Sequence, residues 1–171
     1  MRRAAFLITL LQFLLSSGNL AQDKVPSFAG KWQGDVITRK GDPVLRQTWE
    51  ITFSEKTMTL RIFAEHSENV PTFVYNLDGT DSPKELVDCH GRQDILRLKK
   101  LESKEIEVTQ VGPGCASSPS GGMFITEIWK LSNERNTLTV VRKFRSADPK
   151  TPIRDFENKL SLQRVQPTPG S

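Results

Sequence analysis

The chain has 171 residues, a length that suits one domain with a single hydrophobic core. Its formal net charge is +4. No block of arginine and lysine of the kind that follows a phosphate backbone is present, which argues against nucleic acid as a partner. The densest basic stretch, RLKKLESK at 97–104, alternates as a solvated strand does.

The first residues have the features of a signal peptide. Arg2 and Arg3 precede an apolar run at 4–15, and small residues suited to cleavage after Ala21 follow at 16–22. An uncleaved membrane anchor is the alternative. The apolar run is shorter than the stretch of about 20 residues that crosses a bilayer, so we favour cleavage.

Cleavage would have consequences for location and charge. We expect residues 1–21 to be removed, with cleavage after Gly18 as the alternative, and the mature chain to be secreted or periplasmic without a stable membrane span. The 24 basic residues then become 22, because Arg2 and Arg3 leave, against 20 acidic residues. The high isoelectric point therefore overstates the case for a polyanionic partner.

Apolar and polar residues alternate through the rest of the chain, without helical periodicity. In 47–54, for example, Trp49, Ile51 and Phe53 point to one face of a strand, and the threonines and glutamate between them point to the other. Stretches with strand character follow one another at 30–38, 47–54, 57–64, 72–79, 94–101, 104–111, 123–131, 136–145 and 155–165.

Short polar turns join most of these stretches, as at 54–57, 101–104 and 132–136, and this predicts consecutive antiparallel hairpins. A long meander with one apolar face avoids open edges by closing on itself. The sequence thus predicts an all-β, up-and-down antiparallel β-barrel of about 8–9 strands over 28–165, followed by a disordered tail at 166–171. A β-sandwich is the alternative, but long crossover connections are few.

Two longer loops, 81–91 and 112–122, each carry one of the two cysteines. In an oxidising compartment Cys89 and Cys115 are expected to form a disulfide, which would stabilise the fold by about 3–4 kcal/mol. Two buried free thiols are the alternative. The two histidines, His66 and His90, do not have zinc-finger spacing relative to the cysteines, so we predict no metal site.

The sequence offers no convincing catalytic site, and we predict neither an enzyme nor a bound cofactor. His66 has Glu65 and Glu68 nearby, and His90 follows Asp88 and Cys89. Neighbours on a strand point to opposite faces, so this proximity is poor support for a shared site. A cation could bind around Asp78, Asp81 and Asp88, but they lack calcium-loop spacing.

The first predicted strand opens with Gly30-Lys31-Trp32. A secretory leader, then this Gly-x-Trp element, then a run of hairpin-linked strands resembles the lipocalin-like domains of bacterial secreted and periplasmic proteins. Trp32 is in phase with Gly34 and Val36, so we expect it to face the interior and close the base of the barrel, and Gly30 allows the chain to enter the first strand at an angle that a Cβ would obstruct. The resemblance implies that Arg164 from the last strand covers the indole.

A barrel of this size can hold a small ligand, so the first hypothesis is a protein that binds a small apolar or amphipathic molecule inside the barrel. The candidate lining residues are Trp49, Phe53, Ile62, Phe73, Tyr75 and Trp129. The same side chains would also serve simply to fill the core. The alternative function is a non-enzymatic accessory protein that engages another secreted or envelope protein through loops 81–91 and 112–122.

Overall fold

The computed structural model of the chain describes residues 27–36, 44–85, 93–112, 122–146 and 156–166, and within these ranges the regular structure is all strand. The predicted leader, both cysteines and residues 167–171 lie outside the described residues. In chain order the strands are β1 (Gly30–Val36), β2 (Leu45–Phe53), β3 (Thr57–Ala64), β4 (Thr72–Asn76), β5 (Ser82–Glu85), β6 (Gln93–Glu102), β7 (Glu105–Gly112), β8 (Met123–Leu131), β9 (Thr137–Ser146) and β10 (Phe156–Arg164).

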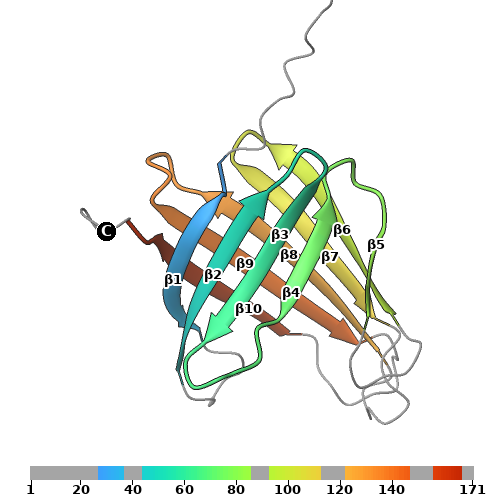
Figure 1. Cartoon of the computed structure of the whole chain (residues 1–171), viewed down its shortest axis with the longest axis horizontal. Coiled ribbons are helices and arrows are strands. Elements are labelled where there is room, and N and C mark those ends of the chain that lie inside the picture. Colours follow the sequence, from blue (N-terminus) through green and yellow to red (C-terminus); the bar gives the residue numbers. More distant parts are fainter. Residues whose placement is uncertain (1–26, 37–43, 86–92, 113–121, 147–155, 167–171) are drawn as a thin grey trace, which may run out of the picture.

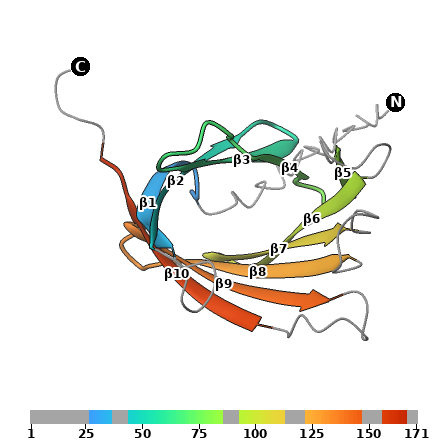
Figure 2. The same cartoon turned by 90° about the horizontal axis from the view of Figure 1, so that it is seen from below.

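The strands form one antiparallel sheet in the order β4-β3-β2-β1-β10-β9-β8-β7-β6-β5 (Figure 1). The first and last strands of the chain pair with each other, with Trp32 opposite Arg164. Seen from below, β2–β4 form one wall and β7–β9 the wall that faces it (Figure 2). The predicted antiparallel barrel is therefore confirmed, and one sheet joined through β1 and β10 excludes the sandwich.

The barrel has ten strands rather than the eight or nine expected, because β5 lies inside the segment predicted as the loop 81–91. Its sequence, Ser-Pro-Lys-Glu, contains Pro83, which lacks a backbone N–H and favours a loop in a sequence-based prediction. Pro83 is tolerated here because β5 ends the sheet and pairs only with β6, where Ile95 is its partner.

The interior is a continuous apolar core formed by Phe28 and by inward-facing side chains of every strand except β5. All three tryptophans, Trp32, Trp49 and Trp129, are fully buried. The other buried apolar residues are Phe28, Val36, Ile51, Met58, Leu60, Tyr75, Leu96, Leu98, Ile106, Val108, Leu131, Leu138, Val140, Leu160 and Leu162. Every strand from β6 to β10 contributes at least one of them, as the predicted alternation requires.

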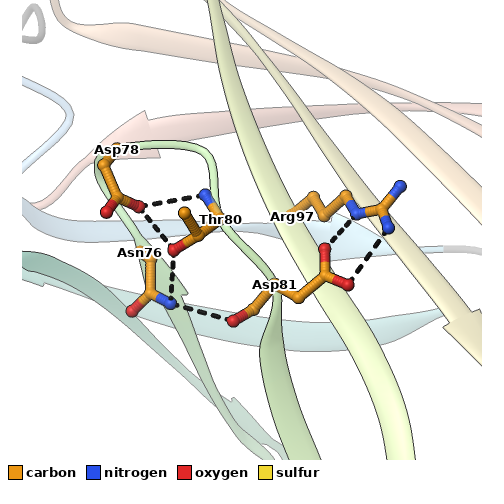
Figure 3. Close-up of polar contacts among 5 residues, drawn as sticks. All are labelled: Asn76, Asp78, Thr80, Asp81 and Arg97. Carbon is orange, nitrogen blue, oxygen red and sulfur yellow. Dashed lines mark hydrogen bonds and ion pairs between the residues drawn. The ribbon is translucent and has the colours of Figure 1, made fainter.

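The two ends of the sheet, β4 and β5, meet at a seam where the described strands are not hydrogen-bonded to each other. The turn between them is held by side chains (Figure 3). The Thr80 backbone N–H and hydroxyl both donate to Asp78 Oδ1, at 2.9 and 2.6 Å. The Asn76 amide donates to Thr80 Oγ1 and to the Asp81 carbonyl, and Arg97 of β6 binds the Asp81 carboxylate with two nitrogens. These contacts connect β4, β5 and β6 without a backbone ladder.

Candidate ligand-binding site

The base of the barrel is closed by stacked aromatic side chains, which we call the tryptophan floor: Phe28, Trp32, Trp49 and Trp129. Trp49 of β2 and Trp129 of β8 come from facing walls and meet with ring centroids 5.4 Å apart. Phe28 packs edge-on against Trp129 at 6.4 Å and accepts a 2.8 Å hydrogen bond from the Trp32 indole through its carbonyl. The interior is thus filled at this level.

Arg164 covers the Trp32 indole, with its guanidinium carbon 4.2 Å from the ring centroid. The same guanidinium donates to the carbonyls of Ser27, Ala29 and Arg135 at 2.8, 2.7 and 2.9 Å. Burial and the nearby charge of Arg135 lower the pKa of Arg164, which still leaves an arginine charged. The group connects the start of β1, the β8–β9 turn and the end of β10.

Next to the floor lies a buried pair of opposite charges, which we call the inner ion pair: Glu127 of β8 and Arg142 of β9. They are cross-strand partners, their side chains are only 10% and 16% exposed, and Arg142 Nε lies 2.5 Å from Glu127 Oε1. The other carboxylate oxygen, Oε2, accepts the Trp129 indole N–H at 2.6 Å. Both oxygens of Glu127 are therefore occupied by protein donors.

The inner ion pair is surrounded by aromatic groups. The Arg142 guanidinium lies 5.8 Å from the ring centroids of both Trp49 and Phe144. Burial raises the pKa of Tyr75 in β4, the charge of Glu127 adds to the rise, and the charge of Arg142 opposes it. Tyr75 is the only tyrosine in the chain and is almost fully buried.

A second set of inward polar groups lies near the seam. Asp94 of β6 is buried and accepts a hydrogen bond from the Gln110 amide of β7 at 2.5 Å. Lys84 of β5 is the cross-strand partner of Asp94, and its ammonium lies 3.8 Å from the centroid of Phe73 in β4. Burial lowers the pKa of Lys84, and the charge of Asp94 opposes that shift.

Solved structures with the same arrangement of strands are known. The chain is similar to a secretary abundant heat soluble protein from Ramazzottius varieornatus, with a TM-score of 0.57 and 10% identity over 82% of this chain and 96% of that one. It is similar to a Schistosoma mansoni fatty acid binding protein in complex with arachidonic acid, with a TM-score of 0.52 and 16% identity over 83% and 98%. A REP1-NXSQ fatty acid transporter matches with a TM-score of 0.52 and 12% identity over 82% and 97%.

The chain folds as a lipocalin-like β-barrel. At these identities the similarity establishes the fold alone. No protein-family model matches the sequence, and no curated protein matches it. The expected relation to bacterial secreted and periplasmic proteins therefore stays a prediction.

The lipocalin-like barrel places the six predicted lining residues on its inner face, but in two different environments. Trp49 and Trp129 are fully buried in the tryptophan floor, and Tyr75 is buried beside the inner ion pair. Phe53, Ile62 and Phe73 are only partly buried and pack against the core from β2, β3 and β4. Their contact with a ligand stays a prediction.

The sequence reasoning missed Glu127 and Arg142, although a signal for both was present. Glu127 is in phase with Trp129 and Leu131 along β8, and Arg142 is in phase with Val140 along β9. A charged residue on the apolar face of an alternating strand predicts a buried, paired charge. Both residues can be identified from the sequence by noting which charged residues fall on the apolar face of an alternating strand.

The other candidate residues are not brought into one site among the described residues. The His66 side chain is 89% exposed, lies in a turn after β3 with a positive φ of 64°, and has its Nε2 3.8 Å from Glu65 Oε1. His90, Asp88, Cys89 and Cys115 lie outside the described residues. In the described ranges no cluster of three or more histidine, cysteine or acidic residues could hold a metal ion, and no helix there is long and apolar enough to cross a membrane.

Proposed function

We propose that this protein carries a small apolar or amphipathic molecule inside the barrel and is not an enzyme. The observation that supports this most is the inner wall formed by Phe53, Ile62 and Phe73, whose side chains point inward yet keep accessible surface. Apolar side chains that face inward without complete burial are suited to contact a bound apolar chain.

The comparisons support the same proposal at the level of fold. The similar structures include a fatty acid transporter and a fatty acid binding protein solved with arachidonic acid. The identity to these proteins is only 12% and 16%, so the residues that line this barrel are not inferred from theirs. Its ligand must therefore be argued from those residues rather than from the neighbours.

A binding experiment tests the proposal. The purified protein is incubated with a total lipid extract, and bound lipid is measured by native mass spectrometry. We expect a retained lipid, and we expect Ile62→Gln on the inner face of β3 to bind it about tenfold more weakly, because a polar amide replaces apolar contact. The matched control is Phe63→Gln, which changes the next residue on the outer face, beside Arg61.

Two results would contradict the carrier function. One is a protein that emerges empty from every extract and binds no added lipid. The other is an equal loss of binding in the Ile62→Gln and Phe63→Gln variants, since that would point to a general loss of structure.

We also propose that the carrier acts outside the cytoplasm, on the basis of the predicted leader at 1–21 and of the even number of cysteines, Cys89 and Cys115. The same protein, expressed with its leader, is analysed by denaturing mass spectrometry. The expected mass corresponds to cleavage after Ala21 and to loss of the two thiol hydrogens of Cys89 and Cys115. An intact leader or two free thiols would overturn this part of the proposal.

A further inference from the structure

The buried charges inside the barrel cancel each other. Among the described strands, the inward charged side chains withdrawn from solvent are Glu127, Arg142, Asp94 and Lys84. Each cation is the cross-strand partner of an anion, Arg142 of Glu127 and Lys84 of Asp94. These four side chains, two cations and two anions, therefore add no net charge to the interior.

The remaining inward-phase cations do not change this balance. Arg164 lies over Trp32 at the base, where its guanidinium donates to three carbonyls. Lys100 lies at the end of β6, where it is exposed to water.

The inner ion pair is also closed to a new anion. Arg142 directs its Nε to Glu127, and Glu127 uses its second oxygen to accept the Trp129 N–H. A carboxylate that approached Arg142 would meet the negative charge of Glu127 at the same point. It would lose its hydration without gaining an unpaired cation, and burying a charge in that way is strongly unfavourable.

We propose that the ligand of this barrel is a neutral amphiphile, with an uncharged hydroxyl, ester or amide head, and that the barrel discriminates against free fatty acids. This inference rests on the carrier function proposed above and specifies its ligand class. A neutral head avoids the cost of an unpaired charge and can still hydrogen-bond to inward polar groups such as the Tyr75 hydroxyl. It also separates this chain from the similar fatty acid transporter and fatty acid binding protein.

The test compares three ligands with the same hydrocarbon chain: oleyl alcohol, methyl oleate and oleate. Their affinities for the full mature chain are measured near neutral pH by displacement of an uncharged fluorescent lipid. The wild-type protein is expected to bind the alcohol and the ester at least about tenfold more tightly than the acid, because only the acid carries a charge near neutral pH.

Variants of the inner ion pair test whether Glu127 and Arg142 cause the preference for neutral ligands. Glu127→Gln keeps the side-chain shape and the acceptor for the Trp129 N–H but leaves Arg142 without an anionic partner. The affinity for oleate should therefore rise at least about tenfold relative to the affinity for the alcohol. The matched control is Glu50→Gln, which removes an ion-paired carboxylate from the outer face, next to Lys31 and Arg61, and should leave the preference unchanged. The double variant Glu127→Gln/Arg142→Gln removes both charges and should keep the preference of the wild type even if the single variant is too unstable to purify.

The outcomes separate the two proposals. A wild-type protein that binds oleate as tightly as the alcohol overturns the neutral-ligand inference and leaves the carrier function intact. Unchanged preference in a folded Glu127→Gln protein also overturns the inference, because the charge pair would then not set selectivity. A wild-type protein that binds none of the three contradicts both.

Discussion

Arg164 shows how one side chain closes the base of the barrel. Its guanidinium covers Trp32 and at the same time satisfies the carbonyls of Ser27, Ala29 and Arg135. Gly30 makes room for it, because a Cβ there would lie 2.7 Å from Arg164 Nη1 and the backbone φ is +130°. The Gly-x-Trp element and the arginine of the last strand therefore act as one unit.

At this scale we predict that Arg164→Ala lowers the free energy of unfolding by about 2–4 kcal/mol, because it removes the cation–π contact and leaves carbonyls without a donor. Arg164→Lys keeps the charge but not the fork of donors, so it should recover less than half of that loss. Urea unfolding measures both, with Lys159→Ala, an exposed residue of the same strand, as the control. Wild-type stability in Arg164→Ala would refute the role of Arg164 at the base.

The pairing of β1 with β10 joins the two halves of the sheet through a short contact. Two residue pairs form its ladder, Trp32 with Arg164 and Gln33 with Gln163, whereas β1 pairs with β2 over seven. Gly34 follows on β1, and a Cβ at this position would lie 2.6 Å from the Ser161 carbonyl oxygen. The last strand can approach the first because Gly34 has no side chain.

Gly34→Ala is therefore predicted to destabilise the fold by about 1–3 kcal/mol, since backbone must move to admit the methyl group. Elsewhere in an extended strand the same change would tend to stabilise by restricting the unfolded chain. The control is Asp35→Ala, an exposed neighbour on β1, and the measurement is the midpoint of thermal or urea unfolding. A Gly34→Ala protein at least as stable as the wild type would show that β10 does not need this close approach.

At the scale of the whole molecule, the barrel brings facing walls together and buries polar groups between them. Trp49 of β2 reaches Trp129 of β8, and Tyr75 of β4 lies near Glu127 of β8, although these residues are far apart in the sequence. Burial is the largest cause of the raised pKa of Tyr75, so this single tyrosine reports on the integrity of the entire barrel.

We predict that the Tyr75 phenol does not ionise in the folded protein at the pH where free tyrosine does. Its folded pKa lies above the unfolded value of 10.0, so its contribution to stability is fully present below that pH and is lost as the pH rises further. Alkaline titration should show tyrosinate absorbance appearing together with loss of β-structure by circular dichroism, whereas the protein in denaturant titrates near 10. Tyr75→Phe removes the absorbance signal. Ionisation near 10 with the fold intact would mean that Tyr75 is open to solvent.

Much of this architecture could be predicted from local pattern. Alternation in stretches such as 47–54 identifies strands and their inner faces, because successive side chains of a strand point to opposite sides. Short polar turns make those strands consecutive neighbours, which leads to an antiparallel barrel. β5 was missed because Pro83 disfavours a strand locally, and only its place at the end of the sheet makes it acceptable.

The amino-acid sequence by itself determined the class of fold and the inner face of most strands, because these depend on local periodicity and turns. Only the tertiary structure decided which inner residues meet. Trp49 and Trp129 became part of the floor, and Glu127 and Arg142 formed a compensated pair, through closure of the sheet. Contacts across a barrel depend on strand register and curvature, and a charge is neutralised only when its partner is placed beside it.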